Sequence, residues 1–176
     1  MRRTVIAPWT EKWNELYILE AAEMKRILHP EQIDIFHIGS TAVPAIGYAK
    51  PTIDLLVVVK EIGRVDLYEQ EMAELGYSAR GEQGIAGRRY FTKGGNSRTH
   101  HVHIFEAGNI NIKTHLDFKA YMLAHPEEAA RYGKLKLELA EKFPDDIHKY
   151  QAGKEAFVQA LVDKSIIYAS EQQNTD

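Results

Sequence analysis

Residues 37–59, HIGSTAVPAIGYAKPTIDLLVVV, decide the fold of this chain. An apolar segment, Ile33 to Ile38, ends in Gly39-Ser40 just inside this stretch. The stretch closes with a β-branched run, residues 53–59, which is long enough for a largely buried strand. Prolines and a glycine lie between the two apolar segments and are typical of a loop. The stretch therefore predicts two strands joined by a short connection.

Several residues of this stretch suit the binding of phosphate. Gly39 has no Cβ, so the backbone can come close to a ligand, and the amides of a turn at Ser40 and Thr41 can cradle a phosphate. Lys50 precedes the second strand, where it could reach a phosphate, a neighbouring carboxylate or the solvent. These residues are the first candidates for a phosphate site.

Asp54 is a carboxylate inside a run that otherwise indicates core. A buried carboxylate is costly unless it is paired or bound to a metal. Two interpretations follow. Asp54 either holds a divalent cation, or it is a structural carboxylate bonded to Ser40 or Lys50.

A glycine-serine turn after one strand and an aspartate on the next resembles the signature of the nucleotidyltransferase superfamily. The string HIGSTAVPAI…AKPTIDLLVVV resembles more narrowly the GrpB family, and so do the opening VIAPWTEKWNELYILEAAEM and the segment after Ser97. The resemblance implies that the Gly-Ser turn holds a triphosphate and that strand carboxylates hold Mg²⁺. Zn²⁺ and Mn²⁺ are the alternative cofactors. It covers most of the chain.

The chain departs from the superfamily pattern at one position. The usual Asp-x-Asp or Asp-x-Glu places two carboxylates on one face of a strand, where they share a metal. Leu56 stands where the second carboxylate is expected. This departure puts two-metal catalysis in doubt.

Composition limits the possible functions. The chain has 176 residues, 44% hydrophobic and 27% charged, which suits one globular domain over residues 1–176, with a frayed tail from 170 to 176. A net charge of −3 argues against broad nucleic-acid binding. The absence of cysteine excludes disulfides and thiolate chemistry. We expect a cytoplasmic protein without a membrane segment, because no apolar run is long enough to span a bilayer.

The rest of the chain predicts further helices and a hairpin. Apolar periodicity predicts helices near 11–28, 63–75, 112–124, 126–143 and 153–169. Residues 88–93 and 98–106 flank a Gly-Gly-Asn-Ser turn and predict a β-hairpin, in which Tyr90 faces His101 and Arg88 faces His103. A slip of one residue would instead bring Arg89 to that face.

The hairpin carries two further candidate groups. Arg88 and Arg89 could hold a nucleotide's phosphates, or could protect a sheet edge from aggregation. His101 and His103 lie two apart on one strand and therefore share a face. They are interpreted as catalytic bases, as phosphate donors, as metal ligands with His103 beside Asp54, or as ordinary strand residues. His115 and Lys119 follow as phosphate-binding candidates, and His115 is also a possible third metal ligand.

Together these features predict an α+β fold, a nucleotidyltransferase-like mixed sheet of about five strands with helices mostly on one face. The expected function is binding of a nucleoside triphosphate and a divalent ion, with transfer of a nucleotidyl group to an unknown acceptor. The expected partner is a nucleotide or another phosphorylated small molecule. The alternatives are a non-catalytic nucleotide- or partner-binding module and a histidine-ligated, metal-dependent hydrolase.

Overall fold

The computed structural model describes residues 4–174, in an order of elements that mixes helices and strands. The described chain divides into two compact units. One takes in the described residues of Met1–Thr10, Gly39–Pro51 and Thr114–Asp176, and the other comprises Glu11–Ile38 and Thr52–Lys113. Whether the chain acts as one domain stays a prediction. No helix among residues 4–174 is long and apolar enough to cross a membrane.

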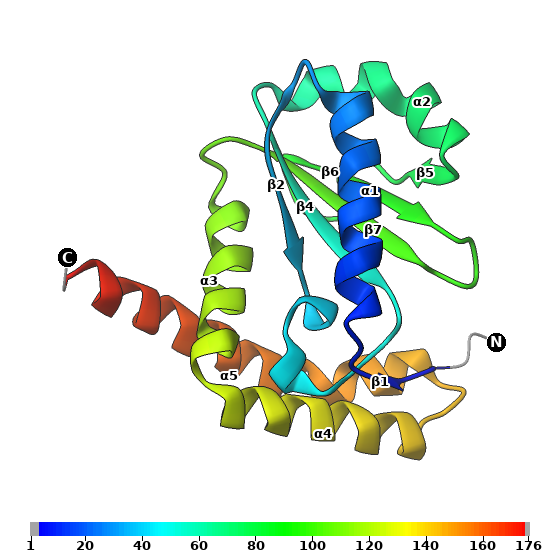
Figure 1. Ribbon diagram of the computed structural model, residues 1–176. Helices are drawn as coiled ribbons and strands as arrows, with labels where there is room; N and C mark the ends of the chain where they lie inside the picture. Colours follow the sequence, from blue (N-terminus) through cyan, green and yellow to red (C-terminus); the bar gives the residue numbers. More distant parts are fainter. Residues whose placement is uncertain (1–3, 175–176) are drawn as a thin grey trace. The chain divides into compact units, whose positions relative to one another are not determined.

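The second unit is built on a five-stranded mixed sheet of order β2-β4-β7-β6-β5 (Figure 1). β4 and β7 are parallel, and the other neighbours are antiparallel. The predicted α+β class with about five strands is confirmed. The strands are β2 Gln32–Ile38, β4 Ile53–Val59, β5 Tyr77–Ala79, β6 Arg88–Lys93 and β7 His100–Glu106.

Helix α1, Lys12–Leu28, packs against β2 and β4 and covers one face of this sheet (Figure 1). The buried residues of α1 recur at helical spacing, because residues three and four positions apart share a face of a helix. They include Trp13, Met24, Ile27 and Leu28. β4 is almost entirely buried, as its β-branched sequence predicts, and only Asp54 is half-buried. β4, an internal strand of the sheet, thus lies in the core of the unit and has one side chain, Asp54, that is only partly buried.

The face of the sheet beneath α1 also holds a buried polar cluster. Oε1 of Glu20 accepts hydrogen bonds from the Tyr77 hydroxyl at 2.8 Å and from Nζ of Lys93 at 2.9 Å. Nε2 of His100 lies 3.7 Å from Oε2 of Glu20 and has no hydrogen-bond partner. The pKa of His100 is lowered, first by burial and also by the charge of Lys93, although Glu20 acts in the opposite direction.

The first unit contains a two-stranded sheet and most of the helical C-terminal part. Its elements are β1 Ala7–Pro8, the 3₁₀-helices Ser40–Ala42 and Pro44–Ile46, β3 Tyr48–Ala49, α4 Pro126–Lys142 and α5 Ile147–Gln173. α3, Ile110–Ala124, continues into it. Its core includes Val43, Ile46, Tyr121, Met122, Tyr132 and Leu161.

Three sequence predictions differ from the structure. The helix expected over 63–75 is a 3₁₀-helix, Ile62–Tyr68, followed by the short α2, Glu69–Glu74, and it contains Gly63, a poor helix former. The last helix begins at Ile147 because Asp146 caps it, its Oδ1 accepting the Lys149 amide at 3.1 Å. It runs through Gln173, so the tail expected to fray from residue 170 is helical up to that point.

The register of the hairpin also differs from the prediction. Tyr90 is opposite His103 and Arg88 is opposite Phe105, a shift of two residues from the expected pairs. The loop is longer than the four-residue turn we assumed, since Lys93 is paired with His100. Because side chains alternate with a period of two, a shift of two leaves every side chain on its predicted face. Arg88, Tyr90, His101 and His103 therefore share one face, as predicted.

Gly133 of α4 lies where the helix meets the chain at Ile46, and a Cβ there would overlap the carbonyl oxygen of Ile46. Gly133→Ala should therefore destabilise the protein by about 1–3 kcal/mol, although alanine in a helix normally gains about 1 kcal/mol over glycine. Urea unfolding measures the difference. Gly63→Ala is the control, because no atom lies within 4 Å of its added Cβ. Equal stability of the two variants would contradict the close approach.

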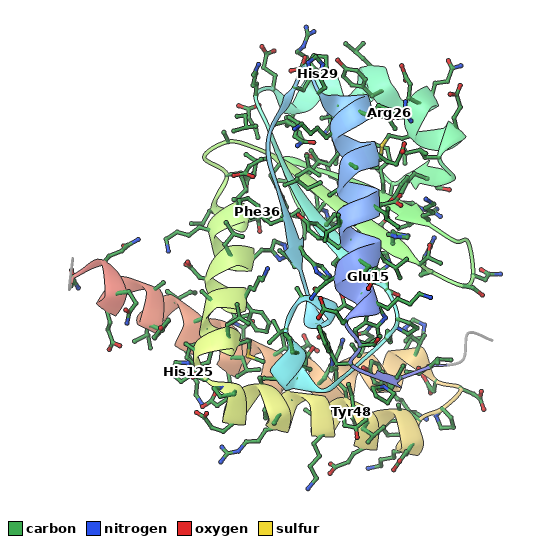
Figure 2. All side chains as sticks on the ribbon, viewed as in Figure 1. Glu15, Arg26, His29, Phe36, Tyr48 and His125 are labelled. Carbon is green, nitrogen blue, oxygen red and sulfur yellow. The ribbon has the colours of Figure 1, made fainter. Side chains whose placement is uncertain are left out.

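His100 should make stability depend on pH. Its folded pKa lies below the ordinary value of 6.5, so below that pH the unfolded chain binds a proton that the folded chain does not. Stability should therefore fall as pH falls from 6.5 toward the folded pKa, by up to about 1.4 kcal/mol per pH unit. His100→Asn should remove this slope, whereas His29→Asn, at the exposed end of α1 (Figure 2), should keep it. An unchanged slope in His100→Asn would refute the assignment.

Candidate functional site

Asp54, His101 and His103 form one cluster on the two central strands of the sheet. In the parallel pair, Asp54 is opposite His101 and Leu56 is opposite His103. Because opposite residues share a face, the three polar side chains project from the same side of the sheet. Oδ1 of Asp54 lies 3.1 Å from Nδ1 of His101 and 3.3 Å from Nε2 of His103. Both imidazoles therefore lie beside the carboxylate of Asp54.

The carboxylate of Asp54 is ionised. Burial, the largest single influence, raises its pKa, but the hydrogen bonds from His101 and His103 and the charges of these rings together outweigh burial. The pKa of Asp54 therefore lies well below its usual range. An ionised carboxylate can only accept, so the ring nitrogens facing it are the protonated ones.

Arg88 fixes the orientation of the second imidazole. It is 6% exposed, and its Nη1 lies 3.4 Å from Nδ1 of His103. A guanidinium can only donate, so Nδ1 of His103 accepts and its Nε2 carries the proton toward Asp54. Both ring nitrogens of His103 are thus engaged. His101 is different, because it faces Asp54 through Nδ1, so in its neutral form the lone pair lies on Nε2.

Arg88 is held by the loop that precedes its strand. Nε donates to the carbonyl of Glu82 at 3.1 Å and Nη2 to that of Gln83 at 2.9 Å, while the guanidinium lies 4.5 Å from the centre of the Tyr90 ring. Burial lowers the pKa of Arg88. Its donors therefore meet protein groups, and its predicted role in phosphate binding stays a prediction.

Arg89 makes an ion pair away from this cluster. Its Nε and Nη2 lie 2.6 and 3.1 Å from the two carboxylate oxygens of Asp66. The hydrogen bond to Asp66 raises its pKa. Arg89 is opposite Ile104 and so belongs to the other face of the sheet from Arg88. Its predicted contact with phosphate likewise stays a prediction.

Two arginines that the sequence did not single out lie next to the cluster. Nε of Arg80 and Nη1 of Arg98 both donate to the hydroxyl of Thr92, at 3.2 and 2.7 Å. Thr92 is the cross-strand partner of His101. The alternation of side chains along the strand could have placed Thr92 on the same face as Tyr90. Nothing in the sequence indicates that two arginines from loops reach its hydroxyl.

The other predicted phosphate-binding residues belong to the first unit. Gly39 has a φ of 73°, a conformation that favours glycine, and precedes the 3₁₀-turn Ser40–Ala42. The carbonyl of Thr41 accepts from Nε1 of Trp9 at 3.0 Å, and Nζ of Lys50 lies 4.5 Å from the centre of the Tyr150 ring. His115 and Lys119 lie on α3, where burial lowers the pKa of Lys119. Their roles stay predictions.

A protein-only metal centre finds no support in residues 4–174. No group of three or more histidine, aspartate or glutamate side chains in this range could hold a metal ion. The atoms of Asp54, His101 and His103 that could bind a metal form hydrogen bonds with one another instead. The predicted ligands Asp54 and His103 could contribute at most part of a coordination shell. This arrangement does not favour the alternative function, a histidine-ligated, metal-dependent hydrolase.

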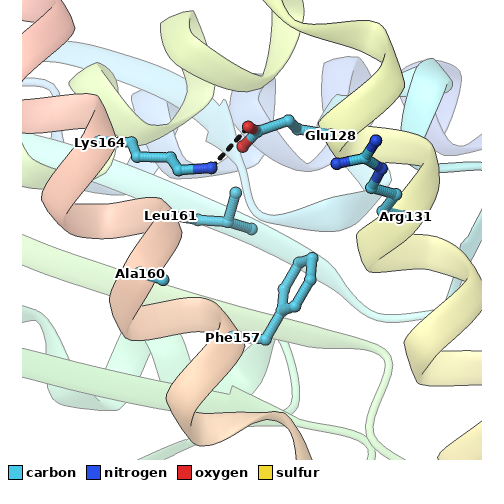
Figure 3. A pocket seen from close by; sticks show the side chains of 6 residues that line it. All are labelled: Glu128, Arg131, Phe157, Ala160, Leu161 and Lys164. Atoms are coloured by element: carbon cyan, nitrogen blue, oxygen red, sulfur yellow. Dashed lines mark hydrogen bonds and ion pairs between the residues drawn. The ribbon is translucent and has the colours of Figure 1, made fainter.

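A small cavity lies between α4 and α5 in the first unit (Figure 3). It has a volume of about 70 Å³ and is lined by Glu128, Arg131, Phe157, Ala160, Leu161 and Lys164. Nζ of Lys164 pairs with Glu128 at 2.6 Å, and the Tyr121 hydroxyl donates to the same carboxylate at 3.1 Å. Ligand pockets are usually about 300–1,000 Å³, so this cavity is too small to be the primary site.

Comparisons with known proteins agree on one family. The GrpB protein family model matches residues 3–164. The UPF0157 protein YqkA of Bacillus subtilis is 46% identical over 89% of this chain, and glutamate-rich protein GrpB of Alkalihalophilus pseudofirmus is 32% identical over 91%. The chain spans 46% of the length of YqkA and 94% of that of GrpB.

Solved structures give the same result. The crystal structure of the conserved protein GrpB from Enterococcus faecalis matches with a TM-score of 0.90 and 41% identity, covering 94% of this chain and 99% of that one. The Cid1 poly(U) polymerase matches at a TM-score of 0.44 and 14% identity, over 70% of this chain and 43% of that one, which is too distant to bear on function. The chain belongs to the GrpB family.

Proposed function

We propose that this protein binds a nucleoside triphosphate together with a divalent cation and transfers a nucleotidyl group to a hydroxyl-bearing acceptor. The observation that carries the proposal is the ionised carboxylate of Asp54 on a buried central strand, with two imidazoles on the same face of the sheet. An ionisable group with a strongly perturbed pKa, such as Asp54, is a candidate functional residue. A cytoplasmic location remains part of this proposal.

Asp54 supports cation binding in a specific way. Oδ1 receives both imidazole hydrogen bonds, so the second carboxylate oxygen remains for a cation. Mg²⁺ commonly keeps its waters and takes one or two carboxylates plus substrate phosphates, rather than an all-protein shell. A single carboxylate therefore suits a Mg²⁺ ion that arrives with the triphosphate better than it suits a resident metal.

His101 is the histidine that suits a general base. Nδ1–H donates to Asp54, which orients the ring and stabilises the imidazolium that forms when Nε2 takes a proton. In the proposed reaction the acceptor hydroxyl gives its proton to Nε2, its oxygen bonds to the α-phosphorus, and pyrophosphate leaves. His103 cannot do the same while Arg88 occupies its Nδ1.

A non-catalytic nucleotide-binding module is the second candidate, and Leu56 favours it. Leu56 is fully buried and lies opposite His103, at the position where the superfamily pattern expects a second carboxylate. Such a module would bind the nucleotide and the cation without turnover. Binding and pyrophosphate release, measured separately, distinguish the two candidates.

Mg²⁺-nucleotide should stabilise the folded protein. At a hundred times the dissociation constant the gain is about 2.7 kcal/mol, which for a chain of this size raises Tm by roughly 5–10 °C. Asp54→Asn should abolish the Mg²⁺-dependent part of this shift in a thermal-shift screen, because an amide is a poor ligand for a hard cation. The matched control is Asp34→Asn, an exposed aspartate of β2 whose Oδ1 accepts the Ile35 amide. A Mg²⁺-dependent shift that survives in Asp54→Asn would refute the role of Asp54.

His101→Gln should separate catalysis from binding. Loss of a general base costs about 10²–10⁴-fold in rate, so pyrophosphate release should slow by that factor while the Mg²⁺-nucleotide Tm shift persists. His103→Gln is the comparison. Both ring nitrogens of His103 are engaged, so its replacement should disturb the orientation of Asp54 more than proton transfer. Equal release rates in wild type and His101→Gln would refute His101 as the general base, whereas binding without any release by the wild type would leave only the binding module.

A further inference from the structure

Arg80 and Arg98 come from different loops and converge on one buried hydroxyl. Arg80 directly follows β5, and Arg98 lies in the connection between β6 and β7. Nε of Arg80 and Nη1 of Arg98 donate to Oγ1 of Thr92 at 3.2 and 2.7 Å. Thr92 is only 3% exposed. One oxygen therefore receives two charged donors, and the two guanidinium groups lie side by side.

No carboxylate in the described part of the chain is paired with either of these two cations. Within residues 4–174, neither Arg80 nor Arg98 makes an ion pair, whereas Arg26, Arg64 and Arg89 are each paired with an acidic side chain. Two like charges held together repel each other, and within residues 4–174 each guanidinium uses only one of its N–H groups, the one on Thr92, in a hydrogen bond. Since no described acidic side chain is paired with the two arginines, an anion would supply their counter-charge.

The location of the pair ties it to the candidate site. Thr92 is directly opposite His101 on the neighbouring strand, and His101 is directly opposite Asp54. Opposite residues share a face, so the two guanidinium groups reach the sheet on the same side as the ionised carboxylate. Arg88 and Arg89, the two arginines that the sequence favoured, donate to protein groups, whereas Arg80 and Arg98 keep donors that no described residue occupies.

We propose that Arg80, Arg98 and Thr92 form a binding site for a phosphoryl group beside Asp54 and His101. Guanidinium groups present forked donors that match phosphate oxygens, and two of them can share one phosphate or grip adjacent ones. The phosphoryl group belongs either to the nucleotide's triphosphate or to an acceptor that itself carries a phosphate. Only this choice rests on the proposed function, since anion binding by the arginines does not require catalysis.

Calorimetric titration of the full chain with tripolyphosphate, without divalent ions, tests the site. We expect saturable binding that weakens with added salt, and at least a tenfold rise in Kd for Arg80→Gln and for Arg98→Gln. Arg26→Gln should leave Kd unchanged, because this arginine is exposed on α1 (Figure 2) and paired with Glu23 at 2.9 Å. Absence of binding by the wild type, or the same Kd in both variants and the control, would overturn the proposal.

Two further variants keep the outcome clear. Arg80→Lys and Arg98→Lys retain the charge but lose the fork, so each should raise Kd less than its glutamine counterpart; circular dichroism confirms that the variants are folded. Asp54→Asn should still bind tripolyphosphate. If it does while the wild type shows no Mg²⁺-nucleotide shift, the proposed function fails and the phosphoryl site stands.

Competition identifies the source of the phosphoryl group. If Mg²⁺-nucleotide displaces tripolyphosphate from the wild type, the arginines hold the triphosphate. If inorganic phosphate and Mg²⁺-nucleotide bind together, and Arg98→Gln weakens only the phosphate, the site receives a phosphorylated acceptor. If both ligands bind together and Arg98→Gln weakens neither, the anion occupies some other place and the proposal is wrong.

Discussion

The parallel pairing of β4 with β7 is the constraint on which the rest of the structure depends. It places Asp54 opposite His101 and Leu56 opposite His103, and so brings a carboxylate and two imidazoles from segments 47 and 49 residues apart within hydrogen-bonding distance. The strands are held in place by their buried apolar positions, such as Leu55, Val57, Val102 and Ile104, and not by the polar residues. Hydrophobic burial therefore fixes the pairing of β4 with β7, and this pairing places the polar side chains of the cluster.

Alternation explains what the sequence could predict. The face shared by Arg88, Tyr90, His101 and His103 follows from period-two spacing alone, and it survived a two-residue error in the hairpin register. The buried run of β4 and the apolar stripe of α1 were equally legible, because each has a strong period. The start of α5 could not be predicted, because aspartate disfavours a helix interior. Only the structure shows that the side chain of Asp146 caps the Lys149 amide.

The arginines show why the rest could not be predicted. The sequence does not distinguish the four arginines, yet their partners differ. Arg88 donates to backbone carbonyls, and Arg89 is paired with Asp66. Arg80 and Arg98 share the hydroxyl of Thr92. Which partner a long side chain meets depends on loop paths, and the loops before β6 and β7 have no periodicity to read. Charge composition is visible in a sequence, but charge compensation is a property of the fold.

The adjacent histidines His100 and His101 have a consequence for the folding of β7. They point to opposite faces, one toward Glu20 and the other toward Asp54. A strand slipped by one residue would still offer an imidazole to Asp54, so the polar contacts discriminate poorly between the native pairing and this decoy. The discrimination comes from Val102 and Ile104, both fully buried, which the slip would move to the opposite face of the sheet and away from their native packing partners. In this chain the buried Val102 and Ile104 therefore select the register that brings His101 and His103 to Asp54.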